Sequence, residues 1–205
     1  SLHRAGQRML LVWHDTRTGS DRLYAVSSSD AGVTWTEPAR VDHLPADSAA
    51  QTSSPAALLS ADGEAMVAWQ DTRNGRHDIF LGRSTDGGRT WGTEDRRMDM
   101  DEAGTAVSQY PRLARAVDGR VALAWDDDRE GLEGVYLRVR SAGDRPEWGR
   151  EIRAASPAPK RAARLPQLLW ADGLLYVAWE AWDYTLGPES VTKRVAGNAL
   201  HVDTP

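Results

Sequence analysis

The chain has 205 residues, with 25 lysines and arginines against 30 aspartates and glutamates, and a net charge of −5. The charges are interspersed without a basic block, so we do not expect a nucleic acid as a partner. The absence of cysteine excludes disulfides and thiolate metal sites, and no apolar stretch approaches the ~20 residues of a transmembrane segment.

The first predicted elements are two strands. Ser1–Ala5 aligns with the end of a first strand, and the apolar run Met9–Trp13 predicts a second. Similar apolar runs end at Trp69, Trp125 and Trp179, at spacings of 56, 56 and 54 residues. This constant period marks an internal repeat and predicts one continuous assembly of repeated units.

The next repeated element is an Asp-x-Arg segment that follows the tryptophan. It occurs three times, as residues 15–17, 71–73 and 127–129. Its arginines, Arg17, Arg73 and Arg129, are candidate ligand-binding residues, because a guanidinium can grip a carboxylate with two hydrogen bonds. Since the pair recurs, the alternative is an ion pair or loop clamp that holds successive units together.

A third repeated element is the pattern Ser-x-Asp-x-Gly-x-Thr-Trp, at residues 28–35 and 84–91. Aspartate can accept hydrogen bonds from backbone N–H groups of a turn, and glycine supplies a positive φ. We therefore predict structural turns whose aspartates are not catalytic, with the tryptophan buried between layers. The predicted structural residues are Ser28, Asp30, Gly32, Thr34, Trp35, Ser84, Asp86, Gly88, Thr90 and Trp91.

Later copies of this turn are degenerate. Residues 141–148 keep only the serine and the tryptophan, and in the fourth copy a short turn at residues 196–198 is expected in its place. Seven of the nine tryptophans occupy repeat positions, so they are predicted to be core residues rather than sugar-stacking platforms.

The repeated turn resembles the Asp-box of BNR-repeat proteins in the sialidase-like β-propeller superfamily. In the second copy, residues 55–59, 64–70 and 78–83, with a fourth strand near Thr90–Trp91, predict a four-stranded propeller blade. The expected fold class is all-β, with four four-stranded antiparallel blades in this chain as part of a larger sialidase-like propeller of six or more blades. Approximate blade limits are residues 1–48, 49–106, 107–161 and 162–205. The remaining blades are expected from the same longer polypeptide or from another subunit.

The fourth copy departs most from the repeat, and function in repeat proteins often lies where the repeat breaks. In place of Asp-x-Arg we expect a loop that carries Glu180, Trp182, Asp183, Tyr184 and Glu189. With the three repeated arginines, this loop is the predicted ligand site, because carboxylates beside aromatic rings can bind a sugar. The resemblance implies a further reading, a Tyr–Glu nucleophile pair, and the simplest alternative is a diverged loop covering the propeller edge.

Two further sets of residues could have a functional role. The residue after each strand-two tryptophan varies between His14, Gln70, Asp126 and Glu180, which either tunes a central cavity or reflects drift at a solvated position. We expect no cofactor and no metal, although the acidic residues 99–102 offer a weak calcium alternative.

Two functions are compatible with these features. The favoured one is a noncatalytic Asp-box propeller module that binds a glycan or a protein partner. The alternative is part of a glycoside hydrolase of the exo-α-sialidase type, whose catalytic residues lie largely outside this chain. The Arg-Ile-Pro segment of sialidases is absent, and no catalytic role is transferred to its nearest look-alike, Arg164-Leu165-Pro166. The resemblance also implies a secreted, periplasmic or cell-surface protein.

Overall fold

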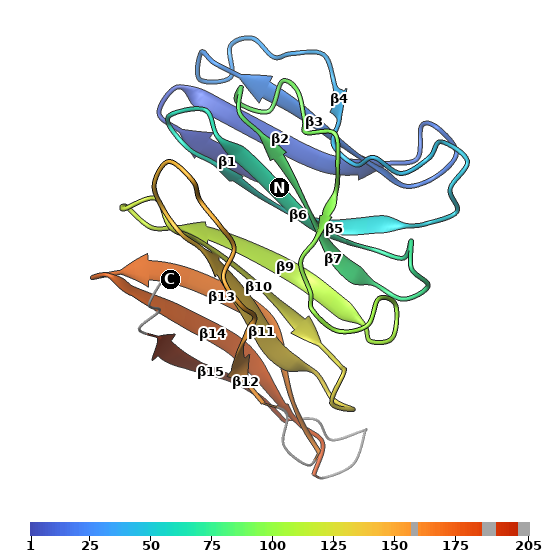
Figure 1. The fold of residues 1–205 in the computed structure, drawn as a ribbon, viewed down its shortest axis with the longest axis vertical. Coiled ribbons are helices and arrows are strands. Elements are labelled where there is room, and N and C mark those ends of the chain that lie inside the picture. Colours follow the sequence, from blue (N-terminus) through green and yellow to red (C-terminus); the bar gives the residue numbers. More distant parts are fainter. Residues whose placement is uncertain (157–159, 186–191, 201–205) are drawn as a thin grey trace. The chain divides into compact units, whose positions relative to one another are not determined.

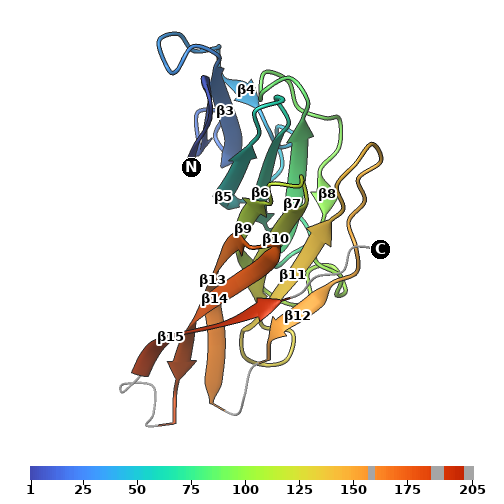
Figure 2. The same cartoon turned by 90° about the vertical axis from the view of Figure 1, so that its left-hand side faces the viewer.

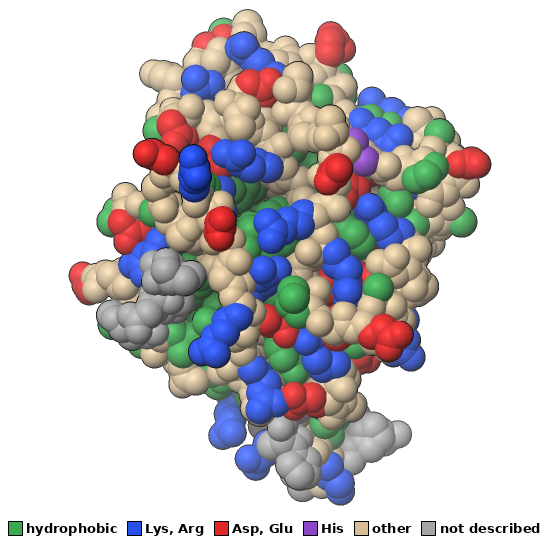
Figure 3. All heavy atoms as spheres, in the orientation of Figure 1, with side chains coloured by type: hydrophobic (Ala, Val, Ile, Leu, Met, Phe, Trp, Pro, Cys, Tyr) green, Lys and Arg blue, Asp and Glu red, His purple; other side chains and the backbone are tan. Residues whose placement is uncertain are grey.

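The computed structural model describes residues 1–156, 160–185 and 192–200, and its regular elements are β-strands (Figure 1). Within these ranges there is no helix that is long and apolar enough to cross a membrane. The strands form four antiparallel sheets, which confirms the all-β prediction. Charged side chains of both signs are interspersed over the face shown in Figure 3.

The chain divides into two compact units, Ser1–Asp99 and Met100–Pro205, with two sheets in each (Figures 1 and 2). Sheet 1 comprises β1 (Leu2–Ala5), β2 (Arg8–Asp15), β3 (Arg22–Ser28) and β4 (Ala39–Arg40), and sheet 2 comprises β5 (Thr52–Leu59), β6 (Ala65–Asp71), β7 (Asp78–Ser84) and β8 (Arg96–Arg97). Sheet 3 comprises β9 (Ser108–Arg115), β10 (Val121–Asp127), β11 (Gly134–Arg140) and β12 (Ile152–Ala155), and sheet 4 comprises β13 (Arg161–Ala171), β14 (Leu174–Asp183) and β15 (Thr192–Leu200).

Two details of the predicted strands are wrong. The fourth strand of the second copy is β8, which begins at Arg96 rather than near Thr90–Trp91. The expected turn at residues 196–198 is instead part of β15, where Gly197 pairs with Ala178. A Cβ atom at Gly197 would lie 2.7 Å from the carbonyl oxygen of Val177, so this glycine permits a close strand approach rather than a turn.

Each unit has its core between its two sheets. In the first unit, Leu10 and Val12 of β2 pack with Val67 and Trp69 of β6, and all four are fully buried. In the second unit, Ala122 and Ala124 of β10 belong to one cluster with residues of β14. In unit 1 the two sheets therefore pack face to face. The even-numbered side chains of β2 contact the odd-numbered side chains of β6.

The first strands of sheets 2, 3 and 4 share a strained bulge. Ser54, Tyr110 and Leu165 each have φ near +53° and each precedes a proline. A register shift accompanies the bulge in all three strands. A positive φ at a non-glycine residue costs about 1–3 kcal/mol, so the bulge is a strained feature that the first strand repeats at one position.

A buried arginine organises the linker between sheets 1 and 2. Arg22 is 1% exposed and donates hydrogen bonds to the carbonyl oxygens of Pro45 (2.9 Å), Ser48 (2.7 Å) and Ala50 (3.2 Å). The linker thus wraps around the guanidinium, whose two terminal nitrogens donate to backbone acceptors, whereas its buried Nε has no hydrogen-bond partner among the described residues.

Candidate functional site

The repeated Asp-x-Arg segments form ion pairs within each segment. Asp71 lies at the end of β6, and its carboxylate receives hydrogen bonds from the backbone N–H and the guanidinium of Arg73. It also accepts a hydrogen bond from Trp69 Nε1 at 3.0 Å, which ties the segment to the core. Each arginine also lies over an aromatic ring of strand three, at 4.6 Å for Arg17 over Tyr24, 3.8 Å for Arg73 over Phe80 and 4.2 Å for Arg129 over Tyr136.

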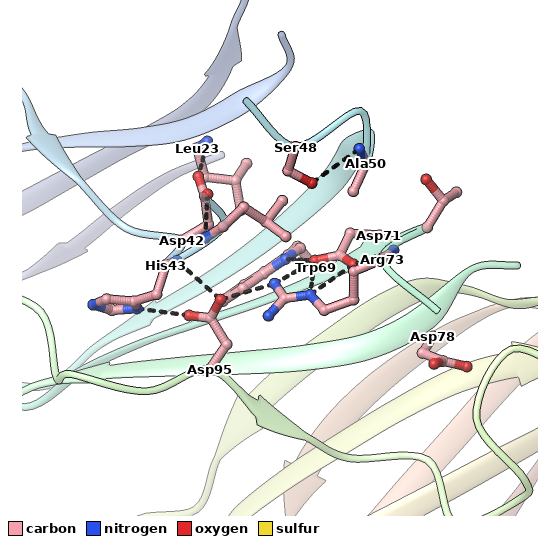
Figure 4. Close-up of polar contacts among 12 residues, drawn as sticks. Leu23, Asp42, His43, Ser48, Ala50, Trp69, Asp71, Arg73, Asp78 and Asp95 are labelled. Carbon is pink, nitrogen blue, oxygen red and sulfur yellow. Dashed lines mark hydrogen bonds and ion pairs between the residues drawn. The ribbon is translucent and has the colours of Figure 1, made fainter. Parts of the chain in front are cut away.

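In unit 1 the arginine is further fixed by Asp95, as Figure 4 shows. The Asp95 carboxylate is 1% exposed and accepts hydrogen bonds from Arg73 Nη2 (2.8 Å) and from the backbone N–H of His43 (2.9 Å). His43 Nδ1 lies 2.8 Å from the second carboxylate oxygen. Because His43 belongs to the linker that follows sheet 1, Asp95 joins this linker to sheet 2.

Unit 2 repeats the arrangement with a glutamate. Glu151 accepts hydrogen bonds from Arg129 Nη1 at 2.6 Å and from the backbone N–H of Met100 at 3.1 Å. Burial raises the pKa of Glu151, although Arg129 opposes this effect. We call the set of Asp-x-Arg segment, acid and linker N–H the latch.

The latch favours the clamp alternative over ligand binding by Arg73 and Arg129, because both guanidinium groups are already held by carboxylates. Arg17 differs, since its ion-pair partner is Asp15 and its side chain is 46% exposed, against 21% for Arg73. The assignment of these three arginines to a ligand site stays a prediction.

The two Asp-box turns have matching hydrogen bonds. Asp30 accepts from Thr34 Oγ1 (2.5 Å), Thr34 N (2.9 Å) and Ser28 Oγ (2.7 Å), and these bonds lower its pKa to about 2. Asp86 makes the same contacts with Thr90 and Ser84; burial raises its pKa, but these hydrogen bonds outweigh burial and bring it to about 2. Both carboxylates are therefore acceptors at neutral pH, which is what the predicted structural role requires.

The tryptophans of the two turns differ from the prediction and from each other. Trp91 is partly buried and packs against the core of unit 1, but Trp35 is 41% exposed. The reason is that the Trp91 turn packs on sheet 1, where a Cβ atom on Gly88 would lie 2.5 Å from Leu10. Sheet 1 is the first in the chain, and no preceding sheet among the described residues covers Trp35.

In the fourth copy, charged and aromatic side chains of the predicted site lie close together. The expected loop is wrong for Glu180–Asp183, which continue strand β14 and pair with β13 and β15. Trp182 Nε1 donates to Glu180 Oε2 at 2.8 Å, and the Trp182 and Tyr184 rings are 6.4 Å apart. Asp183 pairs with Arg161 at 2.9 Å. Glu189 lies outside the described residues.

Two cations lie close to the Trp182 ring. Lys193 Nζ lies 3.9 Å and the Arg164 guanidinium carbon 4.6 Å from the ring centroid. The Arg164 Nε is also 3.3 Å from Glu133 Oε1, with both side chains about one-fifth exposed. We name Glu133, Arg164, Glu180, Trp182 and Lys193 the strand-end cluster. Cation–π contacts of this kind hold the indole in a fixed orientation.

Asp126 lies beside the strand-end cluster. It is 1% exposed, and one carboxylate oxygen accepts the backbone N–H of Leu165 at 2.9 Å. Burial raises the pKa of Asp126 to about 7, against the opposing effects of the Leu165 hydrogen bond and of Arg164. A carboxyl group that titrates near neutrality beside an arginine is a common property of functional sites.

The structure thus brings together four of the predicted residues, Glu180, Trp182, Asp183 and Tyr184, within unit 2, whereas Arg17 and Arg73 belong to unit 1. Sequence reasoning missed Arg164, Glu133 and Lys193. The Arg164-Leu165-Pro166 segment contained the signal for the first of these, but its position in the last copy argued against a role.

The acidic residues 99–102 have partners of their own. Asp99 pairs with Arg97 at 3.1 Å, and Asp101 lies 3.8 Å from Arg129. The calcium alternative therefore remains a prediction to which these contacts add no support.

The solved structures to which this chain is similar include β-propeller glycosidases. The chain is similar to an α-L-arabinanase of Penicillium chrysogenum complexed with arabinobiose (TM-score 0.64, 16% identity, 98% of this chain and 62% of that one). It is also similar to a Dyadobacter fermentans protein of unknown function (0.67, 18%, 97% and 51%) and to the NanB sialidase of Streptococcus pneumoniae (0.58, 17%, 96% and 29%). The chain therefore spans less than two thirds of each of these proteins, and at such identities the likeness shows the fold alone. No curated protein matches the sequence significantly.

The match to a family model extends over a longer part of the sequence than any one of the repeated motifs. The family model of the BNR repeat-like domain matches residues 2–123, which is more than half of the chain. Together with the repeated sheets, this match confirms the predicted resemblance: the chain belongs to the BNR repeat-like family and has the fold of a sialidase-like β-propeller segment.

Proposed function

We propose that this chain is a glycan-binding part of a propeller and that the strand-end cluster is where the sugar binds. The observation that carries the proposal is Trp182, whose ring is oriented by Arg164 and Lys193 and whose indole N–H is satisfied by Glu180. Sugars bind to sites that combine an aromatic surface with a few fixed polar groups. The latch arginines play no part in this proposal, because carboxylates of the same chain already engage them.

The chemistry of the cluster favours an anionic sugar. Lys193 and Arg164 supply positive charge close to the indole, and Glu133 is an acidic group within ion-pair distance of Arg164. A carboxylated sugar could replace that contact with a charge-assisted hydrogen bond. An extracytoplasmic location, where such glycans are met, belongs to the same proposal and rests on the family resemblance.

Calorimetric titration with 3′-sialyllactose and arabinobiose tests the proposal; the solved relatives include complexes prepared with these sugars. We expect the sialylated probe to bind more tightly, and Trp182→Ala to weaken it at least tenfold because the stacking surface is lost. Trp35→Ala is the matched control, since Trp35 is an exposed tryptophan in the other unit. Equal affinities for Trp182→Ala and the unaltered protein would refute the assignment, and failure to bind either sugar would favour a protein partner.

A glycoside hydrolase is the second candidate, and Asp126 is the observation that favours it. Its pKa of about 7 suits a proton donor in general acid catalysis. Release of fluorophore from a sialoside or an arabinofuranoside, abolished by Asp126→Asn, would establish this alternative. We expect no turnover under the binding proposal.

A further inference from the structure

The first strand of sheet 4 is bulged directly beside the strand-end cluster. Arg164 lies opposite Glu180 in the β13–β14 register, which then shifts before Gln167. Leu165 lies in this bulge, with φ of +53°. Bulges re-aim the side chains beside them, and here the neighbouring Arg164 guanidinium carbon is 4.6 Å from the centroid of the Trp182 ring. The bulge therefore sets where this cation of the sugar site lies.

Asp126 holds the bulge from the neighbouring sheet. It is 1% exposed, and its carboxylate accepts the backbone N–H of Leu165 at 2.9 Å. Such burial leaves little surface for direct contact with a sugar, so Asp126 acts on the site through Leu165 and Arg164. A protonated carboxyl keeps an oxygen that can accept the same N–H. Protonation therefore changes the charge near Arg164 without removing the acceptor.

Charged groups on several elements surround the Asp126 carboxyl. Arg164 of β13 favours its ionised form, whereas Glu133, next to the start of β11, and Asp127 of its own strand disfavour that form. Arg112 of β9 lines a hollow of about 250 Å³ at the bulge. Burial has the largest effect and raises the pKa of Asp126 to about 7. The carboxyl therefore changes its charge in the neutral pH range.

The equivalent position in sheet 2 shows that this buried place does not require an acid. Gln70 follows Trp69 as Asp126 follows Trp125, and Gln70 is 5% exposed. Its side-chain amide offers an acceptor oxygen without a titratable group. Sheet 3 thus adds a charge that varies with pH, and it adds it where its second strand contacts the bulge beside Arg164.

We propose that Asp126 is a positioning residue of the sugar site and that an anionic sugar binds there together with a proton on the Asp126 carboxyl. This inference rests on the proposed function. The protonated carboxyl keeps its hydrogen bond to Leu165 and leaves Arg164 to pair with the sugar, whereas the ionised carboxyl competes for Arg164 and repels the anion. The bound anion in turn raises the pKa of Asp126, so affinity is greatest below about pH 7 and falls above it.

Calorimetric titration with 3′-sialyllactose at pH 6 and pH 8.5 tests this proton coupling. The sugar's carboxylate is ionised at both pH values, and we expect affinity to be at least about threefold weaker at pH 8.5. At pH 8.5 the complex should also take up protons, which is measured as a dependence of the binding heat on the buffer's ionisation enthalpy. Asp126→Asn keeps the shape and the acceptor, so it should bind equally at both pH values. Asp144→Asn removes the same charge from an exposed position of the same unit and, as the matched control, should keep the fall.

The two pH values separate failure of this inference from failure of the sugar site. Equal affinities of the unaltered protein at pH 6 and pH 8.5, or the same fall in Asp126→Asn, would overturn the inference and leave the site in place. Absence of binding at both pH values would refute the site and the inference with it. Asp126→Ala removes the acceptor and should weaken binding at both pH values; affinities equal to those of Asp126→Asn would show that this residue does not position Arg164.

Discussion

Sheets 1 and 2 carry the same motifs at a spacing of 56 residues but differ in how those motifs are covered. The Asp-box turn of sheet 2 packs on sheet 1 and shields Trp91, whereas the same turn of sheet 1 leaves Trp35 exposed. The arginine of sheet 2 is held by two carboxylates, and that of sheet 1 by one. The comparison shows that the repeat specifies local hydrogen bonds, while a neighbouring sheet decides how much each motif stabilises the fold.

The largest expected difference is between Arg73, which belongs to the latch, and Arg17, which has Asp15 as its ion-pair partner. Arg73→Ala leaves Asp71 and Asp95, with side chains 0% and 1% exposed, without their cation, and we expect it to cost about 3–5 kcal/mol of unfolding free energy. Arg17→Ala exposes Asp15, which is already partly solvated, and should cost far less than Arg73→Ala. Urea unfolding of both variants measures the difference, and equal costs would show that the second carboxylate adds nothing.

The residue after the strand-two tryptophan differs between the sheets, and in sheet 3 it makes stability depend on pH. Asp126 has a folded-state pKa of about 7, against about 3.9 for an unfolded chain, so the folded state binds the proton more tightly. The contribution of Asp126 to stability is therefore greatest below pH 4, falls as pH rises to about 7 and is level above it, with a change of up to about 4 kcal/mol.

Asp126→Asn should remove this fall and make the variant more stable than the unaltered protein at pH 8 but not at pH 4. Melting temperatures between these pH values provide the measurement. His14→Asn, at the exposed equivalent position of sheet 1, is the control and should change stability by under about 0.5 kcal/mol. A parallel pH profile for Asp126→Asn and the unaltered protein would contradict the assignment.

The smallest expected difference concerns the turn glycines. Gly32 and Gly88 both have φ of +89°, so alanine strains the backbone at each by about 1 kcal/mol. At Gly88 the added Cβ also meets Leu10 at 2.5 Å, whereas at Gly32 its nearest contact is Met9 Sδ at 3.2 Å. We expect Gly88→Ala to cost about 1–2 kcal/mol more than Gly32→Ala in thermal unfolding, because Leu10 is fully buried. If the two costs agree, the turn of sheet 2 does not depend on its contact with sheet 1.

The same contrast explains what the sequence could predict. Strands two and three were found within a residue of β6 and β7, because burial gives β6 a long apolar run and β7 an apolar centre at residues 79–81. Strand four was misplaced, since β8 has two residues, both arginines, and no apolar pattern. Asp95 and Glu151 were not singled out, because their role depends on linkers about fifty residues away along the chain.

The candidate site was predicted only in part for a similar reason. Glu180 and Trp182 stood out because the repeat breaks there, but the cations beside them come from neighbouring strands. Lys193 faces Trp182 only through the β14–β15 register, which no motif marks. Arg164 was set aside by comparison with a family motif, although strand pairing places it directly opposite Glu180.

Arg22 has a consequence for the conditions under which the first linker stays ordered. Loops folded around a bound ion lose their shape when the free ion is diluted or chelated, because their stability depends on its concentration. Here the cation is covalently part of the chain and sits at 1% exposure among the linker's carbonyl oxygens. The linker therefore carries its own counterpart of a structural ion, and this part of its order requires no free cation from the medium.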